Sequence, residues 1–296
     1  MTAPSDWAIA AGILVDSGLK TTAVLGLAWG TTRVLSWGSA AQRHAVWACA
    51  LASLPALPWL AWHRGSAIAL DASWIAPVWG LGVLVATLPL LRGVLGLRRL
   101  LARAVEDPVI PRLFTSDELA APITWGLFRP VVVLPSAAAS WPAPHRAAAL
   151  AHERAHIARF DWAVHLATWL VAAAFWFHPL VWLARRELAR EAEHAADDRV
   201  LAEGVRPSDY ASLLVSLAGA GTPRTALGAA PSLVGSRVRA VLDTRSRSAR
   251  RWPALAVAAA LALASLPALA AWPAWSEPVE AELTCTPEPF TWPPSP

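Results

Sequence analysis

The chain has 296 residues, of which 56% are hydrophobic and 16% are charged. Typical globular chains are about 45–50% apolar and about 25% charged, so this composition excludes a disordered protein and is unusual for a soluble one. The two cysteines, Cys49 and Cys285, exclude a disulfide scaffold. The formal net charge is +4, and nearly all of the positive charge is arginine that flanks apolar runs. That pattern is typical of a membrane protein and not of a nucleic-acid-binding surface.

Four apolar stretches are candidate transmembrane helices, judged against the roughly 20 residues that a spanning helix needs. Three lie in an expected N-terminal membrane region, residues 1–103, and one lies near the C-terminus: about 8–30, 43–62, 74–97 and 251–272. Asp16 and Lys20 interrupt the first stretch. An ion pair at helical spacing would keep that helix continuous, but we favour a helix that begins near Thr21.

The arginines predict the orientation of these helices. Basic residues follow the first and third stretches and precede the last, where we interpret 237–251 as the flank of the final span. The loop around Asp71 and the short Pro- and Trp-rich tail, 273–296, carry little positive charge. Because cytoplasmic loops are rich in arginine and lysine, we expect a multi-pass protein of the bacterial cytoplasmic membrane with both termini outside. No secretory signal peptide is expected at the N-terminus.

Residues 152–156 read His-Glu-Arg-Ala-His, the H-E-x-x-H pattern of many zinc hydrolases. On a helix, His152 and His156 lie one turn apart on the same face, where both can bind one metal ion. Glu153 lies beside them and is the candidate catalytic base. The alanine-rich segment before the motif favours a helix. Two histidines alone do not complete a zinc site, so another ligand has to come from elsewhere in the chain.

The acidic segment 190–198 supplies candidates for that ligand. Glu193 and Asp197 are four residues apart and share a helix face. One carboxylate can therefore bind the metal while the other accepts a hydrogen bond from a histidine ring. Glu191 is a further candidate. The alternative is a solvated helix whose glutamates pair with arginines such as Arg190, but the nearby H-E-x-x-H motif favours the metal site.

Together, several segments resemble the BlaR/MecR-type antirepressor membrane metallopeptidases, a gluzincin group. They are WGLFRPVVVLP (125–135), LAHERAHIARFD (150–161), FWFHPLVW (175–182) and REAEHAADD (190–198). The resemblance implies a mainly α-helical, polytopic membrane protein with about four transmembrane helices and a cytoplasmic zinc-protease minidomain that contains a small β element. It also implies that Glu193 is the third zinc ligand and that Asp197 supports a histidine.

We therefore expect residues 104–250 to form a zinc metallopeptidase domain on the cytoplasmic side. Within it, Trp162–Leu183 is apolar and long enough to cross a bilayer. His156 and Glu193 must reach one ion, so this segment cannot leave its ends on opposite sides of the membrane. It either re-enters, with a break at His178-Pro179, or packs against the spans without crossing.

Val131, Val132 and Val133 belong to a β-branched strand between two prolines. As an edge strand beside the histidine helix, it would be a candidate to receive a substrate backbone by strand addition. As a core strand it would serve packing alone. The sequence favours neither interpretation.

By resemblance, the chain is expected to be a zinc-dependent endopeptidase, with one Zn²⁺ per chain, that cleaves a cytoplasmic repressor or itself in signal transduction. Its expected partners are a protein substrate and the lipid bilayer, without direct nucleic-acid binding. β-Lactam-sensing members carry a penicillin-binding domain with a second lysine motif, whereas here Lys20 is the sole lysine, so no direct β-lactam binding is expected. The alternatives are a quality-control protease of the HtpX type and a catalytically inactive membrane signal transducer.

Overall fold

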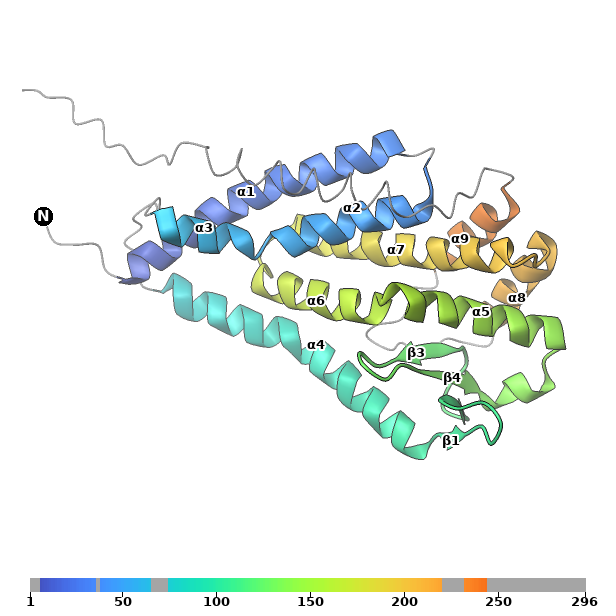
Figure 1. Cartoon of the computed structure of the whole chain (residues 1–296). Helices are drawn as coiled ribbons and strands as arrows, with labels where there is room; N and C mark the ends of the chain where they lie inside the picture. The colour runs from blue at the N-terminus through green and yellow to red at the C-terminus, as the bar shows by residue number, and fades with distance from the viewer. Residues whose placement is uncertain (1–5, 36–37, 65–73, 220–231, 244–296) are drawn as a thin grey trace, which may run out of the picture.

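The structure, a computed structural model, describes most of the chain: residues 6–35, 38–64, 74–219 and 232–243. The predicted last span, 251–272, and the tail that follows it lie outside the described residues. The described part is mainly α-helical and carries one small four-stranded sheet (Figure 1). This architecture confirms the expected helical membrane fold with a small β element.

Within the described residues, three helical stretches are long and apolar enough to cross a membrane: Ala10–Val34, Ala40–His63 and Ile75–Arg103. They correspond to the predicted N-terminal spans. The second stretch consists of α2 (Ala40–Ser53) and α3 (Ala56–Arg64). Pro55 lies between them, where it cannot donate the backbone hydrogen bond that a continuous helix needs.

The first helix corrects one prediction. α1 (Asp6–Val34) does not begin near Thr21 but runs through the charged positions without a break. Lys20 Nζ donates to Asp16 Oδ2 over 2.7 Å, one helical turn away, and both side chains are mostly buried. The ion pair compensates each charge locally, so the helix keeps its path through this turn.

α4 (Ile75–Arg103) presents a broad apolar face. Its 29 residues correspond to about 43 Å at about 1.5 Å per residue, more than the roughly 30 Å hydrocarbon core of a bilayer. Leu81, Leu84 and Leu91 are each more than half exposed, at 61%, 60% and 54%. Such a face is typical of contact with lipid, and the C-terminal end of the helix leads directly into the sheet.

The apolar run 162–183 forms two helices and not one. α6 (Asp161–Ala174) ends before a short turn, and α7 (Pro179–Ala202) begins with a proline at its first position, where the missing N–H costs nothing. α6 and α7 then lie side by side (Figure 1). The predicted break at His178-Pro179 is confirmed. Because the chain reverses there, the beginning of α6 and the acidic part of α7 lie at the same end of the pair.

The main core lies where α2 and α7 pack along each other. Leu51, Val181 and Leu188 have no exposed surface in this core. α1 is joined to the start of α7 by His178, whose Nε2 lies 3.1 Å from Thr22 Oγ1. α1 and α2, which belong to two of the candidate spans, are thereby packed directly on the helix that carries the acidic motif.

The sheet lies between the end of α4 and the helix of the histidine motif. Its strands are β1 (Val105–Glu106), β2 (Leu113–Ser116), β3 (Ile123–Trp125) and β4 (Val131–Pro135), in the order β1-β2-β4-β3. β2 and β4 are parallel, and the other two pairs are antiparallel. Gly126 makes the turn between β3 and β4 at a φ of 112°, and a Cβ there would lie 2.8 Å from the Arg129 carbonyl oxygen.

Of the two interpretations of Val131, Val132 and Val133, the structure excludes the edge strand, and with it their role as a substrate-binding edge, and shows the core strand. Val132 pairs with Leu113 on one side and with Thr124 on the other. β4 is therefore an interior strand whose backbone groups are already paired. The edge of the sheet that faces the histidine helix is β3.

The remaining described helices are η2 (Ser136–Ser140), α5 (Ala143–Arg159), α8 (Pro207–Gly219) and α9 (Ser232–Leu242). α5 packs on α7 and α8, and α9 packs on α7 and α8. Phe160, with a left-handed φ of 58°, ends α5 and precedes α6. This arrangement places α5, α8 and α9 around the acidic segment of α7.

Candidate metal centre

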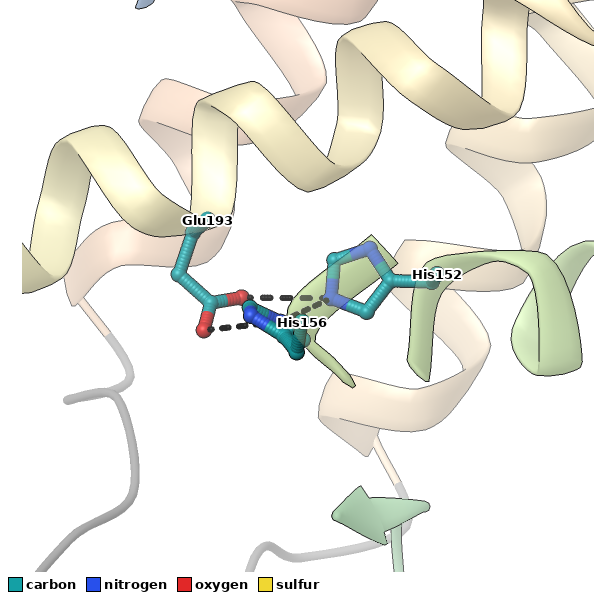
Figure 2. A group of neighbouring side chains, drawn as sticks. All are labelled: His152, His156 and Glu193. Carbon is teal, nitrogen blue, oxygen red and sulfur yellow. Dashed lines mark hydrogen bonds and ion pairs between the residues drawn. The ribbon is translucent and has the colours of Figure 1, made fainter. Parts of the chain in front are cut away.

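Two histidines of α5 and one glutamate of α7 converge (Figure 2). Their potential ligand atoms all lie within 4.8 Å of one another. The Nε2 atoms of His152 and His156 are 3.1 Å apart. The Glu193 carboxylate lies 3.5 Å from His152 Nε2 and 3.8 Å from His156 Nε2. The packing of α5 on α7 therefore brings together the residues that the sequence proposed as ligands.

The hydrogen bonds around the histidines determine which ring nitrogens face this point. His156 Nδ1 lies 2.6 Å from Asp161 Oδ2, and His152 Nδ1 lies 3.0 Å from Tyr210 Oη and 3.2 Å from Asp197 Oδ1. With each Nδ1 engaged, the Nε2 atoms are the ones available to a metal. Two nitrogens on a tetrahedral zinc, at about 2.0–2.1 Å each, are about 3.3–3.4 Å apart. The observed separation of 3.1 Å is close to that value, so the donor set fits one zinc ion.

Asp161 holds His156 from the first residue of α6. Besides the histidine, it accepts a hydrogen bond from Arg159 Nε at 3.1 Å, and Arg159 Nη2 donates to the Ala192 carbonyl of α7 at 2.7 Å. Burial would raise the pKa of the Asp161 carboxyl, but the His156 hydrogen bond and the Arg159 guanidinium hold it well below its usual range. The ionised carboxylate thus fixes the orientation of the His156 ring.

Asp197 has the corresponding place beside His152. Tyr210 Oη donates to its Oδ1 at 2.7 Å, and Arg237 donates to both of its oxygens, at 2.7 and 2.9 Å. Burial would raise the pKa of Asp197, whereas the Arg237 guanidinium and the hydrogen bond with His152 hold it well below its usual range. Arg237 also lies 2.8 Å from Glu193 Oε2, so it contacts both acidic residues of the motif.

The protonation of His152 reflects this surrounding charge. Burial and the Arg237 guanidinium lower the pKa of His152, but hydrogen bonds with Asp197 and Glu193 outweigh them and raise it to about 9. Without a metal, the imidazole is therefore protonated at neutral pH. A metal ion that binds here has to displace that proton.

Glu153 is buried next to the two histidines and faces the sheet. Thr124 Oγ1, from edge strand β3, donates to Glu153 Oε2 at 2.6 Å. The end of β3 is held by Trp125, whose ring packs edge-on against Trp162 at a centroid distance of 4.8 Å. The candidate catalytic base and the edge of the sheet are thus in direct contact.

The structure separates the alternative third ligands. Glu193 lies in the cluster, whereas Glu191 pairs with Arg43 of α2 at 2.9 Å and is not part of it. Sequence reasoning missed Tyr210 and Arg237. The interpretation of Arg237 as part of a basic membrane flank is wrong, because its side chain lies in the centre. Tyr210 is the single tyrosine of the chain, and this was the one feature of the sequence that could have drawn attention to it.

The three candidate spans indicate a membrane-associated protein. The cluster of His152, His156 and Glu193 is a candidate metal centre of the H-E-x-x-H metallopeptidase class. The family model described as BlaR1 peptidase M56 matches residues 57–239, more than half of the chain. The chain therefore belongs to this family, which confirms the resemblance seen in the motifs. Regulatory protein BlaR1 of Bacillus licheniformis is 34% identical over 89 residues, which make up 30% of this chain and 15% of that relative. The match thus spans only a small part of the relative's length.

Proposed function

We propose that this chain is an integral-membrane zinc-dependent endopeptidase whose metal is held by His152, His156 and Glu193. The observation that carries the proposal is the convergence of their ligand atoms within 4.8 Å, from two helices of a chain of the M56 peptidase family. Zinc bound at such a centre would act as a Lewis acid. It would polarise the scissile carbonyl and lower the pKa of a bound water to about 7.

Glu153 is the proposed general base. Its carboxylate is buried beside the histidines, and Thr124 holds one of its oxygens. The other oxygen accepts a proton from the attacking water and passes it to the leaving amine nitrogen. In this proposal Thr124 orients the carboxylate and takes no proton itself.

The substrate segment is proposed to bind along β3 and not along Val131–Val133. β3 uses one side to pair with β4, and its residue Thr124 contacts Glu153. A peptide that adds to the free side of an edge strand gains backbone hydrogen bonds. A peptide bound along β3 has its scissile bond next to Glu153, the candidate base.

The direct test is the zinc content of the full-length, detergent-purified protein. We expect about one zinc per chain in the wild type and loss of the metal in Glu193→Ala, because two histidines alone do not complete the site. Glu187→Ala is the matched control, since Glu187 is on the same helix and pairs with Arg190. A wild type that binds no zinc after metal-replete purification refutes the centre. Zinc that is retained in Glu193→Ala refutes the choice of ligand.

We propose that the substrate is a cytoplasmic repressor or the chain itself. The supporting observations are the M56 family match and the similarity to a regulatory protein. The test is Glu153→Gln, which leaves every proposed ligand in place and removes the base. It should retain zinc and stop both the cleavage and the cellular response. If the response persists in Glu153→Gln, the chain is a signal transducer and not a protease.

We further propose that residues 104–250 lie on the cytoplasmic side of a bacterial inner membrane, with both termini outside. The chain reversal between α6 and α7 and the distribution of arginines support this topology. In a background without native cysteines, cysteines at the exposed positions Ala158 and Arg199 should both resist an impermeant thiol reagent in intact cells. Labelling of either position refutes the proposed topology.

A further inference from the structure

Arg237 reaches the centre from α9, a helix that carries none of the sequence motifs. Its Nη2 and Nε donate to the two oxygens of Asp197 at 2.7 and 2.9 Å. Its Nη1 lies 2.8 Å from Glu193 Oε2, and Nη2 lies 3.4 Å from His152 Nε2. The side chain is only 13% exposed, so these contacts are made away from bulk water.

The two carboxylates that Arg237 contacts have different positions in the centre. Asp197 contacts His152 Nδ1, at the outer side of the ring, whereas Glu193 is the candidate ligand itself. A planar guanidinium can bind one carboxylate with two hydrogen bonds and still present a further donor to a second carboxylate. Arg237 contacts one oxygen of Glu193, so the other oxygen remains for a metal. The guanidinium therefore holds Glu193 and Asp197 in a common geometry without occupying every ligand atom.

α9 depends on these contacts as much as the centre does. It has 11 residues, and isolated helices shorter than about 12–15 residues are only marginally stable in water. Val241 is buried against Leu213 and Leu214 of α8, and Arg237 joins the same helix to α7. The docking of α9 is thus coupled to the arrangement of the acidic residues.

We propose that Arg237 is a positioning residue of the metal centre, and that zinc affinity depends on α9 being docked through it. The inference rests on the proposed zinc site and adds a residue outside both motifs. α9 is the last described helix before the predicted span 251–272, so the centre is held from the segment that leads to that span. A displacement of α9 would weaken metal binding without altering any ligand.

The test measures the zinc dissociation constant of the full-length, detergent-purified protein by competition with a chromogenic chelator. Arg237→Ala should raise that constant about 10–100-fold, the usual effect of removing a residue that orients a ligand. Arg239→Ala is the matched control, because Arg239 is exposed on the same helix, where its Nε donates to the Gly235 carbonyl at 3.2 Å. It should bind zinc as the wild type does.

Arg237→Gln and the thermal melting of the metal-free proteins separate positioning from general damage. Glutamine keeps part of the stem and one donor, so the variant should stay folded and still lose about tenfold in affinity. A wild-type dissociation constant in Arg237→Gln or in folded Arg237→Ala overturns the inference while the proposed zinc site stands. A wild type without zinc overturns the zinc site itself.

Discussion

Replacing Asp161 by asparagine tests whether the residue that orients His156 controls metal binding. The carboxylate is 2% exposed, lies 2.6 Å from His156 Nδ1 and accepts from Arg159 Nε at 3.1 Å. Asparagine has nearly the same shape, but its amide oxygen carries no charge. The substitution therefore removes the electrostatic part of both contacts and leaves the packing in place.

The expected magnitude follows from those contacts. A hydrogen bond to a charged group contributes about 1.5–3 kcal/mol. At about 1.4 kcal/mol for each factor of ten, its loss corresponds to a roughly 10–100-fold weaker affinity for zinc. The buried Arg159 also loses its carboxylate and keeps the Ala192 carbonyl. Because breaking a buried ion pair costs about 3–5 kcal/mol, the metal-free protein should also melt at a lower temperature.

The assay is a zinc competition titration of the purified full-length protein, followed by thermal melting with and without metal. Asp209→Asn is the matched control, since Asp209 is an exposed aspartate on α8. It should change neither quantity. An Asp161→Asn protein that binds zinc with wild-type affinity refutes the reasoning that Asp161 orients a ligand.

Three further predictions concern the same centre and its support. Tyr210→Phe removes the hydroxyl that donates to Asp197 at 2.7 Å, and a chelator titration should show about tenfold weaker zinc binding; unchanged affinity contradicts it. The apparent zinc affinity should rise about tenfold per pH unit between about pH 6 and 8, since His152, with a pKa raised to about 9, must lose a proton; a flat profile argues against His152 as a ligand. Leu134→Ala empties a site with no exposed surface and should lower stability by about 2–5 kcal/mol in a melting experiment; a wild-type melting curve contradicts the assigned core.

Local patterns were sufficient for much of the candidate site. The one-turn spacing of His152 and His156 and the four-residue spacing of Glu193 and Asp197 each place two side chains on one helix face. The break at His178-Pro179 likewise follows from a proline, which favours the first position of a helix. These features depend on residues that are close in the chain, so periodicity and residue type predict them.

Other features were decided by contacts between distant segments. β4 is an interior strand because β2, which lies more than a dozen residues earlier in the chain, pairs beside it. Arg237 reaches the centre from α9, which no periodicity of its own sequence relates to the histidines. Side-chain placement of this kind results from the packing of separate helices, and only the tertiary structure records that packing.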